Sequence, residues 1–302
     1  MLRLERVSKT YRTGAFGRGT TAAVRDVSFE LRPGEVTSLI GESGSGKSTI
    51  GRMILRLTRP TAGTITFDGT DVGRLSGTGL KEYYRHAQGV FQDPFSTYNP
   101  IFRADRVFAM IRQSYFPRVR DEEWRGRVAE AIASVNLNPD LVLGKYPHQL
   151  SGGQLQRLLV ARALLLDIRL LVADEIISML DASTRIDVLN LLADLKERGL
   201  AVLFITHDLS LGNYLSDQTV ILRHGAVVER GATEKVFGDP RHPYTRTLLA
   251  SVPRLGTRWE DLPVPSSDSH ECATPLEEVE EGHFVACFDT NGVHHGRKSE
   301  SV

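Results

Sequence analysis

The amino-acid sequence predicts an α/β fold, and three features of the chain support that prediction. Buried apolar strands at residues 36–40, 169–175 and 201–208 alternate with segments of helical periodicity. A glycine-rich loop at residues 41–49 follows the first of these strands and leads into a helix. Two strands of alternating apolar and polar residues, at 2–7 and 23–31, precede this loop, so we expect an antiparallel β-layer beside the α/β core.

The loop Gly41–Thr49 reads Gly-Glu-Ser-Gly-Ser-Gly-Lys-Ser-Thr and fits the pattern G-x-x-x-x-G-K-[ST]. Glycines let the backbone turn tightly, so that several N–H groups converge on phosphate oxygens. Lys47 adds a charge for the β- and γ-phosphates, and Ser48 offers a hydroxyl to Mg²⁺. The alternative is a Gly/Ser-rich turn that only happens to precede a lysine, but the strand before it and the helix after it favour a phosphate-binding loop. The loop residues that we expect to bind nucleotide are Gly41, Ser43, Gly44, Gly46, Lys47, Ser48 and Thr49.

Composition limits the kinds of partner. The 302 residues include 37 Lys and Arg against 37 Asp and Glu, so the chain has no overall basic charge to attract nucleic acid. No apolar run reaches the roughly 18–20 residues that cross a bilayer, and the N-terminus lacks the apolar stretch of a signal peptide. Two cysteines, Cys272 and Cys287, do not make a disulfide framework. These features predict a soluble, cytosolic chain.

Polar residues end three of the expected strands. Gln92 ends a short strand at 89–92 and can reach Mg²⁺ and an attacking water, although by itself it would be an ordinary loop glutamine. Asp174 and Glu175 end the strand at 169–175, where Asp174 can hold Mg²⁺ through water and Glu175 can polarise the attacking water. A helix cap is the structural alternative for such a pair of acids. His207 ends the strand at 201–208 and can donate to a γ-phosphate, whereas a lone histidine elsewhere is more often structural.

A second candidate anion site lies in the segment Leu150–Gln154, which we call the signature segment. Ser151 is a natural N-cap for the periodic helix at 155–166, and the glycine pair exposes N–H groups at a helix N-terminus. A plain serine-capped helix start is the common alternative. Tyr11, after the first strand, is placed to stack on an adenine ring or to be an ordinary half-buried strand tyrosine.

The order of these motifs resembles the nucleotide-binding subunit of ATP-binding cassette (ABC) transporters. Leu-Ser-Gly-Gly-Gln between a phosphate-binding loop and a strand ending in Asp-Glu is close to diagnostic, and the likeness covers roughly residues 1–235. A narrower resemblance to the oligopeptide/dipeptide importer ATPases rests on residues 92–100, 242–249 and 272–287. The positions that match the family's motifs are Tyr11, Gly41–Thr49, Gln92, Ser151, Gly152, Gly153, Gln154, Asp174, Glu175, Asp181 and His207.

The resemblance implies a cassette at 1–235, built from an α/β core like that of RecA, the antiparallel β-layer and a helical subdomain at about 95–165. A C-terminal extension at 236–302 would follow, with a disordered end. Two cassettes would sandwich two ATP molecules with Mg²⁺ at Ser48, Gln92 and Asp174, each ATP closed by Ser151 and Gly153 of the other subunit. Asp181 would also contact the nucleotide.

The implied partners are two integral-membrane permeases, contacted around residues 92–100, and a second ABC ATPase, in a heterodimer or a homodimer. An extracytoplasmic solute-binding protein would act indirectly, nucleic acid is not an expected partner, and the chain would sit on the cytoplasmic face of the membrane.

The sequence departs from the family beside the catalytic loop. Ile176-Ile177 stands where Pro-Thr is usual after the catalytic glutamate, and Met179 replaces a small residue, which puts hydrolysis rate and loop geometry in question. Some members bind an iron–sulfur cluster through the extension, but two cysteines cannot supply four thiolates, so none is expected. The rival classes are a soluble ABC ATPase acting on nucleic acid or ribosomes, a P-loop kinase or GTPase, and an importer of the same class for sugars or nickel. A guanine-binding Asn-Lys-x-Asp motif is absent, as are long heptads and a second cassette.

Overall fold

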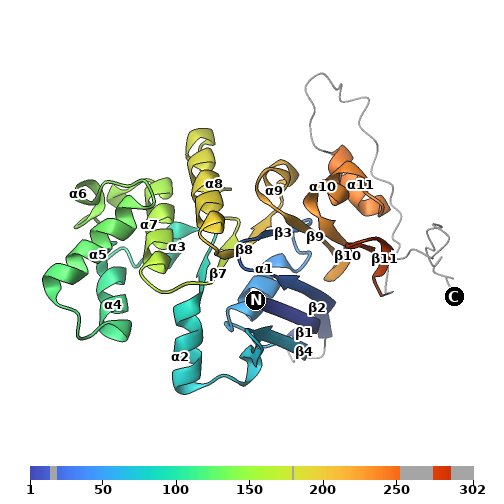
Figure 1. Ribbon diagram of the computed structural model, residues 1–302, viewed down its shortest axis with the longest axis horizontal. Coiled ribbons are helices and arrows are strands. Elements are labelled where there is room, and N and C mark those ends of the chain that lie inside the picture. Colours follow the sequence, from blue (N-terminus) through green and yellow to red (C-terminus); the bar gives the residue numbers. More distant parts are fainter. Residues whose placement is uncertain (14–18, 179, 252–274, 287–302) are drawn as a thin grey trace. The chain divides into compact units, whose positions relative to one another are not determined.

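The computed structural model describes residues 1–13, 19–178, 180–251 and 275–286 (Figure 1). The chain divides into two compact units, the first comprising residues 1–75 and 203–302 and the second residues 76–202. This division follows spatial packing, so the expected boundary between cassette and extension at residue 235 stays a prediction. Among the described residues, no helix combines the length and the apolar character needed to cross a bilayer.

The first unit contains the expected antiparallel β-layer, in the strand order β2-β1-β4-β5. Alternation of apolar and polar residues explains it, since Leu2, Leu4 and Val7 are buried while their neighbours Arg3 and Glu5 face solvent. The first two strands are longer than the sequence predicts, because their pairing with each other continues from Lys9 to Thr13. The layer consists of β1 (Leu2–Thr13), β2 (Gly19–Leu31), β4 (Ala62–Phe67) and β5 (Thr70–Asp71).

The first unit also holds a second sheet, in the order β11-β12-β10-β9-β3-β8. Strand β3 (Val36–Ile40) is buried along its whole length and pairs in parallel with β9 (Gln218–Arg223). β9 and β10 (Ala226–Ala232) form the expected antiparallel hairpin, and β8 (Ala201–Thr206) starts at the end of the second unit. The helices of this unit are α1 (Lys47–Ile54), α9 (Leu209–Leu215), α10 (Thr233–Gly238), α11 (Pro243–Ala250) and the short 3₁₀ helix η1 (Val72–Arg74).

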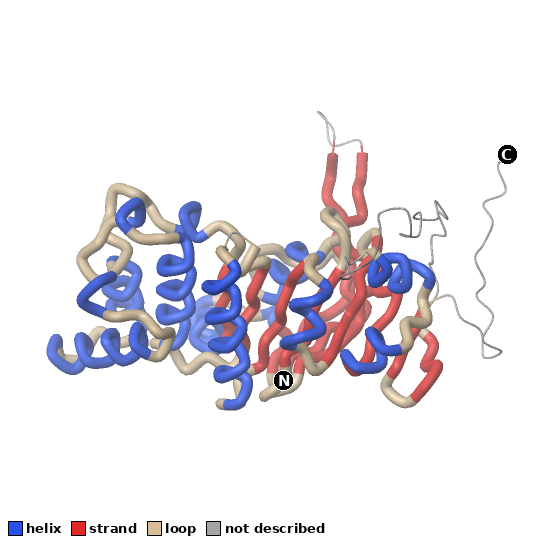
Figure 2. Tube along the Cα trace, turned by 90° about the horizontal axis from the view of Figure 1, so that it is seen from above, coloured by secondary structure: helices blue, strands red, loops and turns tan. Residues whose placement is uncertain are grey.

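The second unit is mostly helical, as Figure 2 shows in blue. Its two strands, β6 (Ala87–Val90) and β7 (Leu170–Asp174), pair in parallel. The expected helical region at about residues 99–138 consists of separate helices, because Pro117 interrupts it. The helices are α2 (Gly77–His86), α3 (Pro94–Thr97), α4 (Arg106–Tyr115), α5 (Asp121–Ala133), α6 (Pro139–Val142), η2 (Pro147–Gln149), α7 (Gly152–Leu164) and α8 (Ala182–Glu197).

A late hairpin of β11 (Glu277–Glu280) and β12 (His283–Val285) was not expected from the sequence. Its outer strand is exposed at every position and rich in acids, so it lacks the alternation that identifies a strand. β12 pairs with β10, which extends the sheet of the first unit. Cys272, Cys287, Met179 and the end expected to be disordered lie outside the described residues.

Candidate functional site

The phosphate-binding loop joins β3 to α1, as the sequence predicts. A side chain is excluded at two of its glycines, because a Cβ on Gly41 would lie 2.2 Å from the carbonyl oxygen of Leu222 and one on Gly46 would lie 2.4 Å from that of Ala23. Gly46 also has φ +104°, which an L side chain rarely adopts. The loop is therefore clamped between β9 and β2 in a form that only glycine permits.

Lys47 lies inside this turn and is only 5% exposed. Its ammonium Nζ donates to the carbonyl oxygens of Gly41 (2.7 Å) and Glu42 (2.8 Å), so the loop curls around the lysine head. An ammonium held there, next to the N-terminus of α1, is suited to an anion such as a phosphate group.

Two further expected site residues, Tyr11 and His207, belong to the first unit. Tyr11 on β1 is 39% exposed and lies two residues beyond Lys9, whose partner across the strands is Val24. The direct partner of Tyr11 across the strands is Thr21 on β2, so its contact with nucleotide stays a prediction. His207 follows β8, the neighbour of β3 in the sheet, and is exposed.

The second unit brings Gln92 to the same sheet edge as the two acids. In the parallel pair, Val90 lies opposite Ala173, so the residues that follow both strands leave the sheet side by side. Asp174 ends β7 in a buried position, and Glu175 comes directly after it. Residues with amide and carboxylate side chains therefore follow neighbouring strands at one edge, and their oxygens are the kind of donor that Mg²⁺ prefers.

Glu175 has a backbone φ of +50°, an uncommon value for a residue with a side chain. Ser178 holds the turn, since both its N–H (3.2 Å) and its hydroxyl (2.8 Å) donate to the carbonyl oxygen of Glu175. Ile176 and Ile177, which depart from the family pattern, are both buried. The unusual pair thus packs in the core next to the turn, and the glutamate keeps its place at the strand end.

The signature segment forms a capping box at the start of α7. The hydroxyl of Ser151 accepts from the N–H of Gln154 (3.2 Å), and the side-chain oxygen of Gln154 accepts from the N–H of Ser151 (2.9 Å). A Cβ on Gly153 would lie 2.5 Å from the methyl group of Thr184 on α8, so glycine is required for close packing.

Asp181 caps α8 by accepting from the N–H of Thr184 (3.0 Å) and the hydroxyl of Ser183 (2.7 Å). These bonds, that from Ser183 first, hold the pKa of the Asp181 carboxyl far below its usual value. The acid is thus a structural cap in this chain, and its contact with nucleotide stays a prediction, as do the roles of the other site residues.

Sequence reasoning missed three contacts to these motifs. The hydroxyl of Tyr244, on α11, accepts from the N–H of Glu42 in the phosphate-binding loop (3.3 Å). On α7, the amide nitrogen of Gln156 donates to the carbonyl oxygen of Phe91 (3.1 Å), and Arg162 donates to that of Gly89 (2.9 Å). The available signal was a glutamine and an arginine within the apolar run of α7.

Comparison with known proteins identifies the family. The ABC transporter family model matches residues 24–178, and a model described as the oligopeptide/dipeptide transporter C-terminal region matches residues 228–276. A putative peptide import ATP-binding protein of Brucella ovis is 39% identical over 96% of this chain and 98% of its own length. The oligopeptide transport ATP-binding protein OppF of Bacillus subtilis is 40% identical over 90% of this chain and 92% of its own length.

Solved structures of ATP-binding cassettes share this fold. A dimeric, post-hydrolysis ATP-binding cassette bound to ADP and Pi has a TM-score of 0.69 and 30% identity, covering 77% of this chain and 99% of that one. A part of an ABC transporter complex from Clostridium perfringens, at 24% identity, shares the fold with a TM-score of 0.68, covering 84% of this chain and 96% of that one. These matches confirm the predicted family and fold class, and we conclude that this chain belongs to the ABC transporter family and carries the C-terminal region of its oligopeptide/dipeptide transporters.

Proposed function

We propose that this chain is the ATP-hydrolysing subunit of an importer for peptides. The match of residues 228–276 to the oligopeptide/dipeptide transporter C-terminal region carries the choice of peptides over other solutes. The names of the relatives, which are peptide import, oligopeptide and dipeptide transport ATP-binding proteins, point the same way. The clamped loop around Lys47 supports ATP as the ligand.

The residues divide the chemistry among them. The phosphate-binding loop and Lys47 hold the β- and γ-phosphates, while Tyr11 stacks on the adenine. The hydroxyl of Ser48, the amide oxygen of Gln92 and the carboxylate of Asp174 would hold Mg²⁺, which would neutralise phosphate charge. Glu175 orients and polarises the attacking water, and His207 donates to the γ-phosphate.

The site is completed by a second cassette. Ser151 and Gly153 of each subunit close over the ATP held by the other, so binding joins two cassettes and hydrolysis releases them. This arrangement explains why a capped helix N-terminus, suited to a phosphate, occurs in addition to the phosphate-binding loop.

The working assembly contains two permeases, a second ATPase subunit and, indirectly, an extracytoplasmic solute-binding protein, and it places this chain on the cytoplasmic face of the membrane. Exposed apolar side chains after Gln92 support a permease contact. Phe95, Ile101 and Phe102 are all exposed within a stretch of eight residues. A cluster of exposed apolar side chains of this kind is typical of a protein–protein contact.

Glu175→Gln tests the catalytic assignment. The amide cannot polarise water as a carboxylate does, so we expect ATP binding to persist while phosphate release falls by about a hundredfold or more. Glu197→Gln, an exposed change at the end of α8, is the matched control and should hydrolyse ATP normally. Unchanged phosphate release in Glu175→Gln would contradict the assignment.

Affinity purification from detergent-solubilised membranes, followed by mass spectrometry, tests the transport role. We expect two multi-spanning permeases and a second cassette protein to be recovered with this chain. Recovery with ribosomal or DNA-repair proteins instead would assign the chain to the soluble ABC ATPases.

A further inference from the structure

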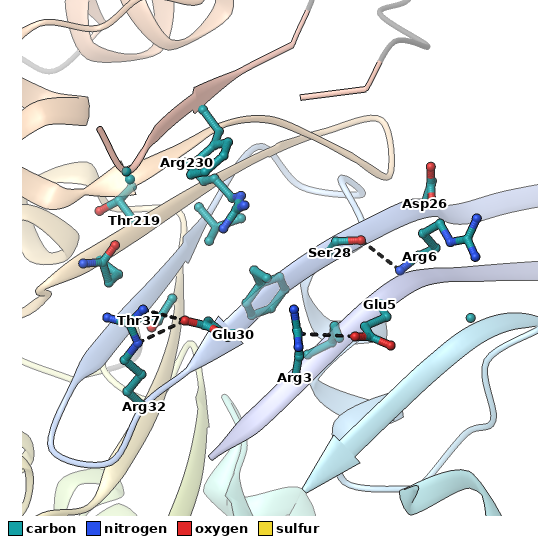
Figure 3. Close-up of a pocket in the computed structure, with 18 of the residues that line it drawn as sticks. Arg3, Glu5, Arg6, Asp26, Ser28, Glu30, Arg32, Thr37, Thr219 and Arg230 are labelled. Atoms are coloured by element: carbon teal, nitrogen blue, oxygen red, sulfur yellow. Dashed lines mark hydrogen bonds and ion pairs between the residues drawn. The ribbon is translucent and has the colours of Figure 1, made fainter. Parts of the chain in front are cut away.

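A groove of about 1250 Å³ runs through the first unit, away from the phosphate-binding loop. Strands β1, β2 and β4 form one wall, and the starts of β3 and β9 with β10 and the β11–β12 turn form the other (Figure 3). Thr37 lines it near the start of β3, whereas the phosphate-binding loop follows the end of that strand, about 13 Å further on at the usual rise per residue. The groove is thus separate from the nucleotide site.

Two side chains in this groove each have a buried polar atom with no hydrogen-bond partner among the described residues. Thr37 is 1% exposed, and its hydroxyl makes no hydrogen bond within the described part of the chain. Arg230, on β10, has a buried Nε without a partner, and no carboxylate among the described residues forms an ion pair with its guanidinium. Unsatisfied buried polar groups are costly, and they mark places where a ligand can supply the missing partner.

Arg230 is also held in place. Its guanidinium lies 4.1 Å from the ring centroid of Phe284, on β12, which orients the planar fork. Burial lowers the pKa of Arg230, although Glu30 and Glu278 act in the opposite direction, and the group stays charged at neutral pH because an arginine titrates so high. A fixed, partly desolvated guanidinium is suited to a carboxylate, which it binds through two parallel hydrogen bonds.

Five acids line the groove (Glu5, Asp26, Glu30, Glu35 and Glu281), and three of them, Glu5, Glu30 and Glu35, pair with arginines other than Arg230. Glu30 accepts from Arg32 at 2.6 and 3.0 Å, and Glu5 pairs with Arg3 at 3.3 Å. In the view of Figure 3, Asp26 lies toward the opposite end of the groove from Thr37 and Arg230. The part of the groove lined by Arg230 and Thr37 therefore offers one guanidinium and one hydroxyl donor to an anion.

We propose that this groove is a second ligand site, which binds a small carboxylate-bearing molecule such as a short peptide or an amino acid, with the carboxylate on Arg230 and Thr37. The site draws on the β-layer, β3, β10 and the late hairpin, so it forms only when the C-terminal hairpin is docked. It is independent of ATP hydrolysis and of the transported solute, and it stands or falls separately from the proposed function.

Isothermal titration calorimetry on the full chain tests the site. The dipeptide alanyl-alanine should bind saturably, whereas the same dipeptide with an amidated C-terminus should bind at least about tenfold more weakly, because the charged partner of Arg230 is gone. Inorganic phosphate serves as a third probe. Tighter binding of phosphate than of the dipeptide, or equal binding of the amide, would overturn the carboxylate assignment.

Three variants locate the binding. Arg230→Met keeps the length of the side chain and should weaken dipeptide binding by about tenfold to a hundredfold, and Thr37→Val should weaken it by about threefold to tenfold. Arg230→Lys keeps the charge but not the fork, and should fall between Arg230→Met and the unaltered chain. ATP affinity and melting temperature, measured on each variant, establish that it is folded. Dipeptide affinity unchanged in folded Arg230→Met, or no saturable binding to the unaltered chain, would refute the proposal.

Discussion

At the scale of single residues, the phosphate-binding loop depends on where a Cβ has no room. Gly46 and Gly44 both have positive φ, at +104° and +80°. Gly44 has no neighbouring atom within 4 Å of an added Cβ, while Gly46 lies against the carbonyl of Ala23. A side chain at Gly44 would therefore cause backbone strain alone, whereas one at Gly46 would cause both strain and a steric clash.

Gly46→Ala should therefore move the loop and weaken ATP binding by more than about tenfold, since strain and clash add. Gly44→Ala carries only the strain, of about 1 kcal/mol, and should weaken binding by a few-fold. Titration with a fluorescent ATP analogue measures both. Equal losses in the two variants would mean that the contact with Ala23 does not shape the loop.

Residue types and spacing predicted the loop, the strand ends and the cap because each works through local geometry. Ser151 and Gln154 are three residues apart, so the capping box closes within one turn. Asp181 was expected to contact nucleotide, and its bonds to Ser183 and Thr184 could not be read from its motif position alone.

At the scale of elements, α11 links the C-terminal region to the phosphate-binding loop. Tyr244 is buried, its hydroxyl accepts from Glu42, and burial raises the pKa of that hydroxyl to about 12, so it remains protonated. The bond therefore persists across the physiological range of pH.

Tyr244→Phe removes the hydroxyl and leaves the ring. A neutral hydrogen bond contributes about 1 kcal/mol, so ATP affinity should fall by about fivefold while the fold is kept. Tyr214→Phe changes an exposed tyrosine on α9 and is the control. ATP affinity unchanged in Tyr244→Phe would show that the contact carries no coupling between α11 and the loop.

The docking of the late hairpin rests on one buried acid. Glu229 on β10 has no exposed surface and accepts from the N–H groups of Arg241 (2.8 Å) and His242 (3.0 Å) and from Nε2 of His283 (2.8 Å). Burial raises the pKa of Glu229, but these hydrogen bonds outweigh it, so the pKa is lowered from its ordinary value of 4.5.

A lowered carboxyl pKa stabilises the folded form above the ordinary value and loses this effect as the pH falls through the folded value. Amide hydrogen exchange in β12 and α11 should therefore accelerate as the pH falls below about 4.5, beyond the intrinsic pH dependence of exchange. Glu229→Gln should abolish this pH dependence, while the exposed Glu234→Gln on α10 should keep it. The same pH response in Glu229→Gln would assign the effect to another group.

At the scale of the whole molecule, the ATP site is proposed to need a second cassette. We expect Ser151→Arg to block the proposed γ-phosphate contact with the partner's ATP, and Lys47→Ala to disable the loop in its own subunit. In a mixed dimer, one composite site loses both residues and the other loses neither.

Each variant alone should thus lack ATPase activity, and an equal mixture should regain about a quarter of the unaltered rate, since half the dimers are mixed and hold one intact site of two, if the two sites hydrolyse independently. Phosphate release on mixing measures this, with crosslinking to establish that mixed dimers form. No recovery despite mixed dimers would exclude action of Ser151 in the partner's site.

The sequence by itself determined the family, the α/β class and the identity of the motifs, because glycine spacing, strand-end acids and helix caps act through a few neighbouring residues. The tertiary structure decided which distant groups meet. Tyr244 contacts Glu42, the buried Glu229 bonds to His283 across 54 positions, and Arg230 lies over Phe284. Such contacts depend on how strands far apart in the chain pair and pack, and no local pattern of residues encodes that.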